Sequence, residues 1–188
     1  MTPAPGDQPR WPVGIVAMHW LTAALVAVQY GIARLMTDDA RDLIARFTLY
    51  QWHKSIGLTV ACLAALRLLH RLITRPPPAI PLPAWQRRAA QAVQAALYLC
   101  LIAIPVTGFL MVCAAPIQIP TLFFGLFAVP HPIGPDKMLY DAMLLWHERL
   151  FDVLAVLTGL HAGAALLHHY VLKDGLTRRM GFARRPQP

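Results

Sequence analysis

The sequence has few charged residues, and this shortage excludes an ordinary soluble domain. Only 14% of its 188 residues are charged, whereas 57% are hydrophobic. A soluble domain carries roughly a quarter charged residues. The long apolar runs instead indicate one integral membrane domain over residues 1–188.

Cysteine is also scarce, and the cysteines present do not form a metal-binding or haem-attachment motif. Cys62, Cys100 and Cys113 lie in apolar runs, and none belongs to a CxxC or CxxCH pattern. The sequence therefore gives no support for a thiolate metal site or a covalently attached c-type haem. We expect the three thiols to be buried and to pack as small hydrophobic side chains.

Four stretches reach the roughly 20 apolar residues that a bilayer requires. The predicted spans cover residues 13–32, 50–73, 89–114 and 143–172. They predict an all-α fold, an integral membrane four-helix bundle. The first ten residues, MTPAPGDQPR, contain no apolar signal-peptide core, so we expect the first span to act as its own insertion signal.

Proline marks the connections between these spans. The segment TRPPPAIPLPAWQRR, between the second and third spans, is predicted to be an extended loop because successive prolines stop a helix. Residues 116–140 are apolar but contain five prolines, so we expect a short interfacial helix or cap at the outer surface. Within the third span, Pro105 and Gly108 suggest a kink.

The distribution of Lys and Arg predicts which ends face the cytoplasm. Eleven basic residues lie at the N-terminus, around the second-to-third connection and at the C-terminus, whereas six lie on the opposite side. The positive-inside rule therefore places both termini of this multi-pass protein in the cytoplasm. The net charge of +8 then reflects topology and contact with anionic lipid. It does not favour nucleic-acid binding, because the charges flank the spans.

Histidines lie in the predicted spans at matched depths. Ionisable residues within a span are costly and are functional candidates by default. His19 is near the cytoplasmic start of the first span, and His53 is near the outer start of the second. In the fourth span, His147 lies near the outer end and His161 lies fourteen residues deeper. Fourteen helical residues cover about 21 Å and return to within about 40° of the same face.

Depth therefore pairs His53 with His147 near the outer surface and His19 with His161 near the inner surface. Two imidazoles facing each other across a four-helix bundle are what a six-coordinate b-type haem requires. Two such pairs predict two haems b in the core and an electron path across the bilayer. For any single histidine, a core residue hydrogen-bonded to a carbonyl is the alternative. Closed zinc or copper sites are disfavoured because no carboxylate or thiolate accompanies the pairs.

Residues beside these histidines are compatible with haem. Gly57 and Gly159 are expected to let the flat macrocycle approach the helices. Lys54, Arg67 and Arg149 are expected to neutralise haem propionates near the two interfaces.

The sequence HHY follows the deeper histidine of the fourth span. His168 lies two turns after His161, at the cytoplasmic end. Because imidazole titrates near neutral pH, His168 is a candidate quinone contact or proton carrier, with an interfacial polar cap as the alternative. Arg67 and Arg71 are grouped with it as candidate quinone-binding residues. Three further histidines are expected to be interfacial or loop residues: His70, His131 and His169.

Several motifs together indicate a family. They are MHWLTAALVAVQY, HKSIGL followed by RLLHRLITRPP, YLCLIAIPVTGFLM, and WHE followed by GLHAGAALLHHYVLKD. With these motifs the chain resembles the bacterial di-haem cytochrome b561 family over nearly its whole length. The resemblance implies that His19, His53, His147 and His161 are the haem ligands. It also implies that superoxide gives an electron at the periplasmic side, that ubiquinone accepts it, and that His168 contacts the quinone.

Two other functions remain open at this point. One is a membrane anchor subunit that passes electrons between a periplasmic dehydrogenase or hydrogenase and the quinone pool, with residues 116–133 as a partner surface. The other is a transporter or proton channel with structural histidines. The second is disfavoured because the sequence lacks the inverted repeats that would support it.

Overall fold

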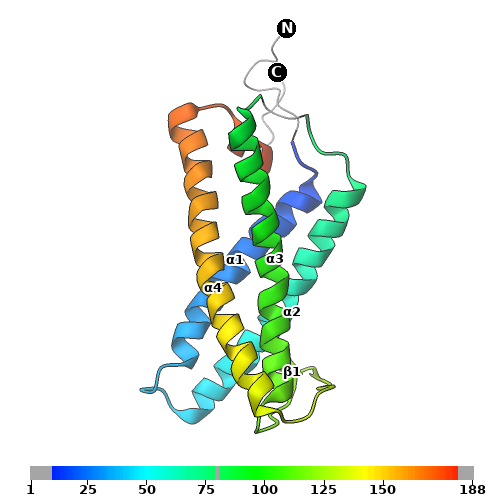
Figure 1. Cartoon of the computed structure of the whole chain (residues 1–188), viewed down its shortest axis with the longest axis vertical. Coiled ribbons are helices and arrows are strands. Elements are labelled where there is room, and N and C mark those ends of the chain that lie inside the picture. The colour runs from blue at the N-terminus through cyan, green and yellow to red at the C-terminus, as the bar shows by residue number, and fades with distance from the viewer. Residues whose placement is uncertain (1–9, 79–80, 182–188) are drawn as a thin grey trace.

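Long helices run the length of the molecule, as Figure 1 shows. The computed structural model describes residues 10–78 and 81–181. Within these residues the long helices are α1 (Val13–Met36), α2 (Leu43–Ile73), α3 (Ala84–Ala114) and α4 (Lys137–Leu166). Each is long and apolar enough to cross a bilayer, so the predicted four-helix membrane bundle is confirmed.

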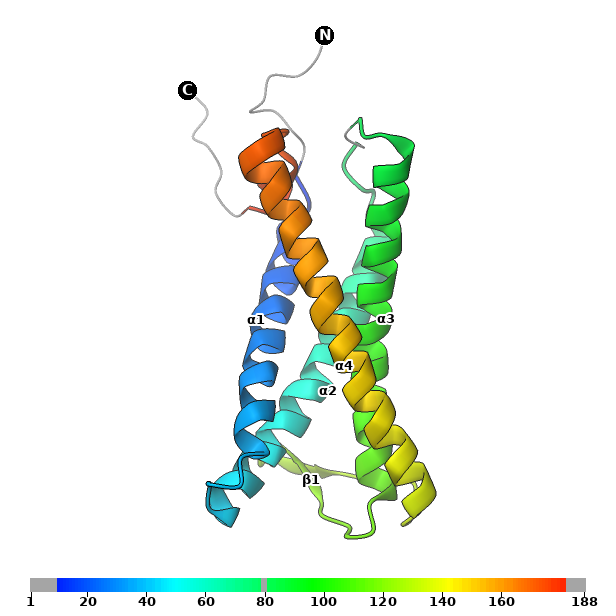
Figure 2. The same ribbon diagram turned by 60° about the vertical axis from the view of Figure 1, so that its left-hand side comes forward.

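The helices pack as two neighbouring pairs, α1 with α2 and α3 with α4, and the pairs meet through α2 and α3. Figure 2 shows that the start of α1 and the end of α4 lie at one end of the bundle. The α1–α2 turn and the strand β1 (Thr121–Phe123) lie at the other end. We call these the inner and outer ends, after the predicted orientation. Because consecutive helices run in opposite directions, residues from distant parts of the sequence meet at the same depth.

Few side chains are buried, because the bundle core is narrow and most of the helix surface faces outwards. Small residues fill much of the core: Ala64, Cys100, Cys113 and Ala114 are at most 3% exposed. Large apolar side chains cover the outside, as expected where lipid replaces water. All three cysteines are free thiols. Cys62 is exposed, so the expectation that all three are buried is wrong for this residue.

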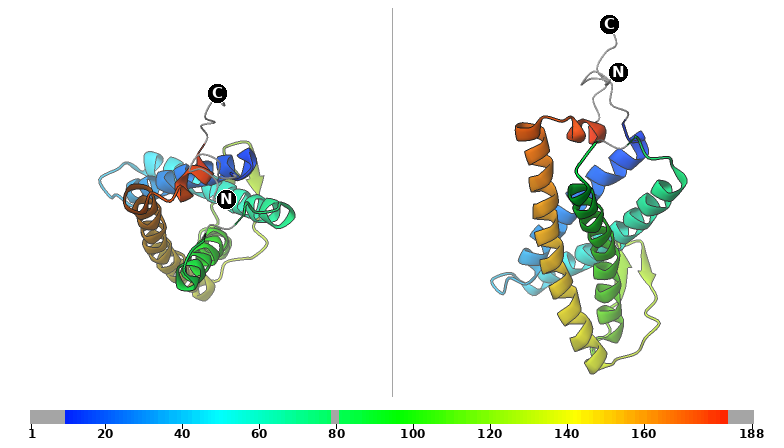
Figure 3. Two further views of the ribbon diagram at one scale, coloured as in Figure 1. Left: turned by 90° about the horizontal axis from the view of Figure 1, so that it is seen from above. Right: turned by 45° about the horizontal axis from the view of Figure 1, so that its top comes forward.

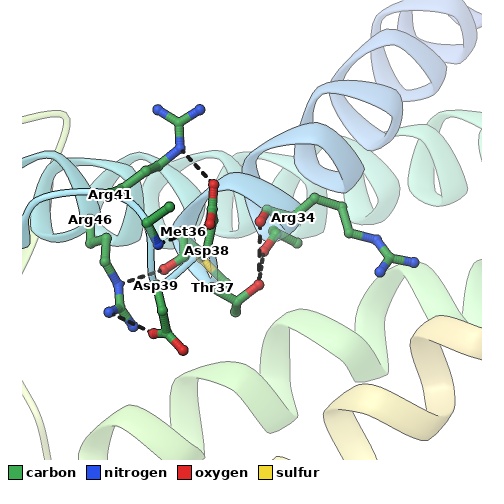
Figure 4. Close-up of polar contacts among 9 residues, drawn as sticks. Arg34, Met36, Thr37, Asp38, Asp39, Arg41 and Arg46 are labelled. Atoms are coloured by element: carbon green, nitrogen blue, oxygen red, sulfur yellow. Dashed lines mark hydrogen bonds and ion pairs between the residues drawn. The ribbon is translucent and has the colours of Figure 1, made fainter.

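Ion pairs hold the α1–α2 turn at the outer end, and Figure 4 shows them as sticks. Arg41 Nε lies 3.7 Å from Asp38 Oδ2, and Arg46 Nη1 lies 3.0 Å from Asp39 Oδ1. Arg34 extends away from this cluster in the same view. The turn therefore keeps its acidic residues engaged with two arginines and leaves Arg34 for other contacts.

Aspartate caps start two helices earlier than the apolar runs predict. Asp42 Oδ1 accepts the N–H of Ala45 at 2.8 Å, and Asp136 Oδ1 accepts the N–H of Leu139 at 3.0 Å. Such caps satisfy N–H groups that the first helical turn leaves unpaired. Both α2 and α4 consequently begin before the spans predicted from hydropathy.

An antiparallel hairpin of β1 and β2 (Phe127–Val129) occupies the segment for which a helix or a cap was expected. The helix alternative is wrong, because Phe124 and Gly125 adopt positive φ values of 47° and 75° that reverse the chain. Ser55 on α2 is 0% exposed and accepts the N–H of Phe124 at 2.9 Å. The hairpin is thereby fastened to α2 and forms a cap over the outer end.

The proline-rich connection between α2 and α3 is shorter than predicted. Its described residues, 74–78 and 81–83, are not helical, whereas the AWQRR portion already belongs to α3. Residues 79 and 80 of the predicted loop lie outside the described residues. Pro105 lies within α3, which continues as one helix on both sides of it.

Beyond α4 the chain folds back across the inner end, as the red segment in Figure 3 shows. A π-helical turn, η1 (Leu167–Leu172), is followed by a 3₁₀ turn, η2 (Leu176–Met180). Trp11 N–H donates to the Arg179 carbonyl oxygen at 3.3 Å, and Trp20 Nε1 donates to the Met180 carbonyl oxygen at 2.9 Å. These bonds attach the C-terminal turn to α1.

Candidate functional site

His53 on α2 and His147 on α4 face each other near the outer end. Their ring centroids lie 6.1 Å apart, and their planes are inclined at 73°. Nδ1 of His147 lies 2.8 Å from the Ile104 carbonyl oxygen. A carbonyl can only accept, so Nδ1 carries the proton in this bond. Nε2 of His147 therefore keeps a lone pair for a ligand, which is the usual second-shell arrangement of a metal-binding histidine.

Gly108 on α3 provides the space for the His147 ring. A Cβ at position 108 would lie 2.8 Å from His147 Cε1 and 3.0 Å from His147 Nδ1. Real Cβ atoms essentially never approach other heavy atoms this closely. Sequence reasoning assigned Gly108 to a kink and missed this role, because its contact with His147 joins residues on two different helices.

His19 on α1 and His161 on α4 form a second facing pair nearer the inner end. Their ring centroids lie 6.2 Å apart, and the planes are inclined at 81°. The Arg67 guanidinium on α2 acts electrostatically on both imidazoles. The structure therefore brings together the two pairs that depth in the sequence predicted.

A cavity of about 960 Å³ lies at the outer pair. Its lining includes both imidazoles and two glycines: His53, His147, Gly57 and Gly108. Binding sites for small molecules typically have volumes of roughly 300–1,000 Å³. The space beside the outer pair is therefore large enough for a ligand of substantial size.

Each histidine pair fits a group that takes one imidazole on each face. Imidazole nitrogens bind metals at about 2.0–2.1 Å, so rings on opposite sides of one iron have centroids roughly 6 Å apart. The separations of 6.1 and 6.2 Å match this requirement. The described residues contain no cluster of three or more His, Cys, Asp or Glu side chains that could hold a metal ion. A haem needs no such cluster, because two axial ligands complete its iron.

Several buried polar atoms near these pairs lack a hydrogen-bond partner among the described residues. They include His53 Nδ1, Arg67 Nε and the Tyr98 hydroxyl. The Arg67 guanidinium carbon lies 5.5 Å from the centre of the Tyr98 ring. Because buried polar groups are nearly always paired, such atoms suit a site that a polar ligand completes. Arg67 lies close to the inner pair, and its guanidinium is well suited to bind the carboxylates of a haem.

Comparison with known proteins identifies the family. A model of the prokaryotic cytochrome b561 family matches residues 10–183. The chain belongs to this family. It is 34% identical over 176 residues to "Cytochrome b561 homolog 2" of Escherichia coli K12, covering 91% of this chain and 90% of that protein. It is 32% identical over 167 residues to "Probable superoxide oxidase CybB" of Yersinia pestis, covering 88% and 92%. It is 29% identical over 167 residues to "Cytochrome b561 homolog 1" of Escherichia coli K12, covering 88% and 93%.

Family membership decides the class of cofactor and of activity. The chain is a multi-pass inner-membrane cytochrome that carries b-type haem and transfers electrons across the membrane. The assignment of individual histidines to haem iron remains a prediction, supported by the two facing pairs.

The other residues of this cytochrome that were predicted to contact haem or quinone make the following contacts. Arg71 donates to Gln94 Oε1 at 3.1 Å, and its guanidinium carbon lies 5.7 Å from the centre of the Trp11 ring. Lys54 Nζ donates to the Pro120 carbonyl oxygen at 3.3 Å, which ties α2 to the residue before the hairpin. Gly57 has limited space beside it, since a Cβ would lie 3.3 Å from the Gln29 side-chain nitrogen, whereas Gly159 is open. Arg149 forms an exposed pair with Asp152 at 3.7 Å.

The remaining histidines have distinct partners. His169 Nδ1 lies 2.9 Å from Thr177 Oγ1, and His131 Nε2 lies 3.0 Å from Thr121 Oγ1 in the outer cap. His70 Nδ1 is buried and has no partner among the described residues, although the residue as a whole is partly exposed.

His168 lies in the π-helical turn, and its Nδ1 forms a hydrogen bond with Asp174 Oδ2. π-helical turns are often found at functional sites. Asp174 was not singled out from the sequence, because the bond depends on how the chain turns after α4.

Proposed function

We propose that this cytochrome oxidises superoxide at the periplasmic side and reduces ubiquinone at the cytoplasmic side, through two haems b. The observation that carries the proposal is that one bundle holds two facing pairs of histidines, and the two pairs lie at different depths. In this proposal His53 and His147 hold an outer haem, and His19 and His161 hold an inner one. The haems supply one-electron carriers, and the protein positions and tunes them.

The chain's own residues set the orientation and the charge of these sites. The Ile104 carbonyl oxygen fixes the tautomer of His147 by accepting a hydrogen bond from its Nδ1–H. Arg67 places a positive charge beside the inner pair, where it would offset the carboxylates of a bound haem. All four imidazoles are partly buried between the helices. Ligand type, charge and burial are the terms that set haem potentials.

The outer cavity supports an anionic electron donor. Its charged lining residues are three basic and two acidic: Arg34, Lys54 and Arg149 against Glu148 and Asp152. A local excess of positive charge in a cleft raises the concentration of an anion there. The Yersinia pestis relative, a probable superoxide oxidase by name, agrees with this choice of donor. Two superoxide anions give two electrons and leave two molecules of oxygen, and quinone takes two electrons and two protons to become quinol.

The inner end supports the quinone side of the reaction. His168 lies there with Arg67 and Arg71, which remain candidate quinone-binding residues. The excess of basic residues at this end supports cytoplasmic termini. Protons for quinol formation would then come from the cytoplasm.

An anchor subunit for a periplasmic redox partner is the second candidate. The observation that favours it is the exposed apolar tip of the outer cap, where Leu126 is 77% exposed and Phe127 is 57% exposed. Exposed apolar patches outside the lipid-facing surface are typical of sites that contact another protein. In this function the outer cap would hold a protein electron donor near His53 and His147, in place of superoxide.

A pulse of superoxide separates the two functions. We expect the purified protein, under anaerobic conditions in nanodiscs, to show low-spin b haem that superoxide reduces and a short-chain ubiquinone reoxidises. In membrane vesicles, superoxide should act only from the periplasmic face. Haem that quinol reduces but superoxide leaves oxidised would favour the anchor subunit. Absence of haem would overturn both.

His168→Ala is expected to keep the haem content and spectrum but to slow haem reoxidation by ubiquinone about a hundredfold or more, the lower end of the range for general acid catalysis. Stopped-flow absorbance after stoichiometric reduction with dithionite measures this rate. His169→Ala is the matched control, because the neighbouring ring contacts Thr177. An unchanged rate in His168→Ala would return this residue to an interfacial cap.

A further inference from the structure

The inner end contains a histidine–carboxylate pair that family membership does not explain. His168 Nδ1 and Asp174 Oδ2 share a hydrogen bond, and their side chains are only 13% and 23% exposed. Partly buried polar pairs are costly to form unless both partners are satisfied. The pair is therefore a candidate for a functional role.

Backbone geometry after α4 brings Asp174 back to His168. Lys173 and Gly175 both have positive φ, 51° and 78°, so the chain reverses at this point. Positive φ is unfavourable for lysine, which indicates that the surrounding structure holds the turn. Asp174 Oδ1 accepts the N–H of Leu176 at 3.0 Å, which leaves Oδ2 for His168. Both carboxylate oxygens are thus fixed.

Asp174 is a carboxylate at neutral pH. Burial alone would raise its pKa, but hydrogen bonds from the Leu176 N–H and from His168 outweigh burial and hold the pKa below the ordinary value. A carboxylate can only accept, so Nδ1 of His168 carries the proton in the bond to Asp174, and the carboxylate faces the charge that the ring carries whenever Nε2 holds a proton as well.

The turn that carries Asp174 is attached to the helix that carries the inner histidine. Trp20 Nε1 donates to the Met180 carbonyl oxygen at 2.9 Å, and Trp20 directly follows His19. Figure 3 shows this segment lying across the inner end of the bundle, beside the start of α1. The histidine–carboxylate pair therefore lies at the end of the bundle closest to the proposed inner haem.

We propose that Asp174 is the positioning residue of a proton-donating dyad in which His168 Nε2 gives one proton to a carbonyl oxygen of the bound quinone. This inference rests on the proposed function and goes beyond it. The N–H bond at Nε2 breaks and an O–H bond forms on the quinone, which receives its two electrons from the haems. His168 is left neutral with Nδ1–H still donating to Asp174, and water at the cytoplasmic surface returns its proton. The second proton reaches the other carbonyl oxygen from water.

Asp174→Asn separates proton donation from quinone binding. An amide has one oxygen and one NH₂ group, so it no longer offers two acceptors to Leu176 and His168. An NH₂ group facing Nδ1 favours the neutral tautomer with the proton on Nε2, which still donates a hydrogen bond to quinone but holds no surplus proton. We expect KM for a short-chain ubiquinone to change less than twofold and kcat to fall about tenfold or more. His168→Ala should instead lower kcat and raise KM together.

The measurement is reoxidation of dithionite-reduced haem by the short-chain ubiquinone, with haem content and spectrum as the check on folding. Asp174→Glu, which keeps the carboxylate, should recover part of the lost kcat. Thr177→Ala is the matched control, because it removes the partner of His169 in the same turn. If Asp174→Asn has a normal kcat while His168→Ala reoxidises its haem slowly, Asp174 is not part of a proton-donating dyad. The quinone site at His168 would still stand. A wild-type protein that ubiquinone does not reoxidise overturns the proposed function and the dyad with it.

Discussion

His53→Ala and His147→Ala are each expected to remove the same single haem, halving the b-haem content per chain. The reason is that each proposed haem depends on one imidazole from each face, and the two rings lie 6.1 Å apart. His19→Ala and His161→Ala should each remove the other haem. The haem-to-protein ratio, with a redox titration to identify which potential is lost, measures the effect.

Double substitutions test the pairing directly. His53→Ala with His147→Ala should retain one intact haem, whereas His53→Ala with His161→Ala should retain none. An intact bis-histidine haem in the second double variant would show that the pairing is wrong. His169→Ala should retain both haems, since that residue contacts the C-terminal turn and not a facing histidine.

Gly108→Ala is expected to displace the His147 ring and so to remove or strongly weaken the outer haem alone. The added Cβ would lie 2.8 Å from His147 Cε1. The ring could move away only by giving up its hydrogen bond to the Ile104 carbonyl oxygen, one turn earlier on the same helix. Alanine is intrinsically better than glycine in a helix by about 1 kcal/mol, so a loss of haem cannot be attributed to weaker helix formation. The haem-to-protein ratio and the low-spin spectrum of the remaining haem measure the outcome.

Gly31→Ala is the matched control for this substitution. It lies in α1, and a Cβ there would meet nothing within 4 Å. Gly31→Ala should therefore keep both haems with unchanged spectra. Full occupancy of the outer haem with an unaltered spectrum in Gly108→Ala would show that His147 does not need the space seen here, or is not a ligand.

The sequence predicted the helices well because a bilayer imposes a length and an apolar composition that can be counted. It also predicted which histidines would meet, since depth along a span depends only on residue number and helical rise. Helix starts were predicted less well: α2 and α4 begin earlier than the apolar runs do, because Asp42 and Asp136 cap helices through polar hydrogen bonds that hydropathy does not register.

The conformation of the outer cap could not be predicted from the sequence, for a different reason. Its apolar, proline-broken sequence was compatible with either an interfacial helix or a cap, and the positive φ values at Phe124 and Gly125 produce a hairpin. The buried Ser55 then fastens the hairpin to a helix that is distant in the sequence. A pattern of apolar residues does not contain such long-range bonds.

The sequence by itself therefore determined the membrane class, the four helices and the depths of the histidines, because these follow from local composition and constant helical rise. Tertiary structure alone decided that Gly108 makes room for the His147 ring and that Asp174 returns to His168. Each of these depends on how separate helices pack or how a left-handed turn redirects the chain. Contacts of that kind are set by the mutual packing of distant segments, which periodicity and spacing do not specify.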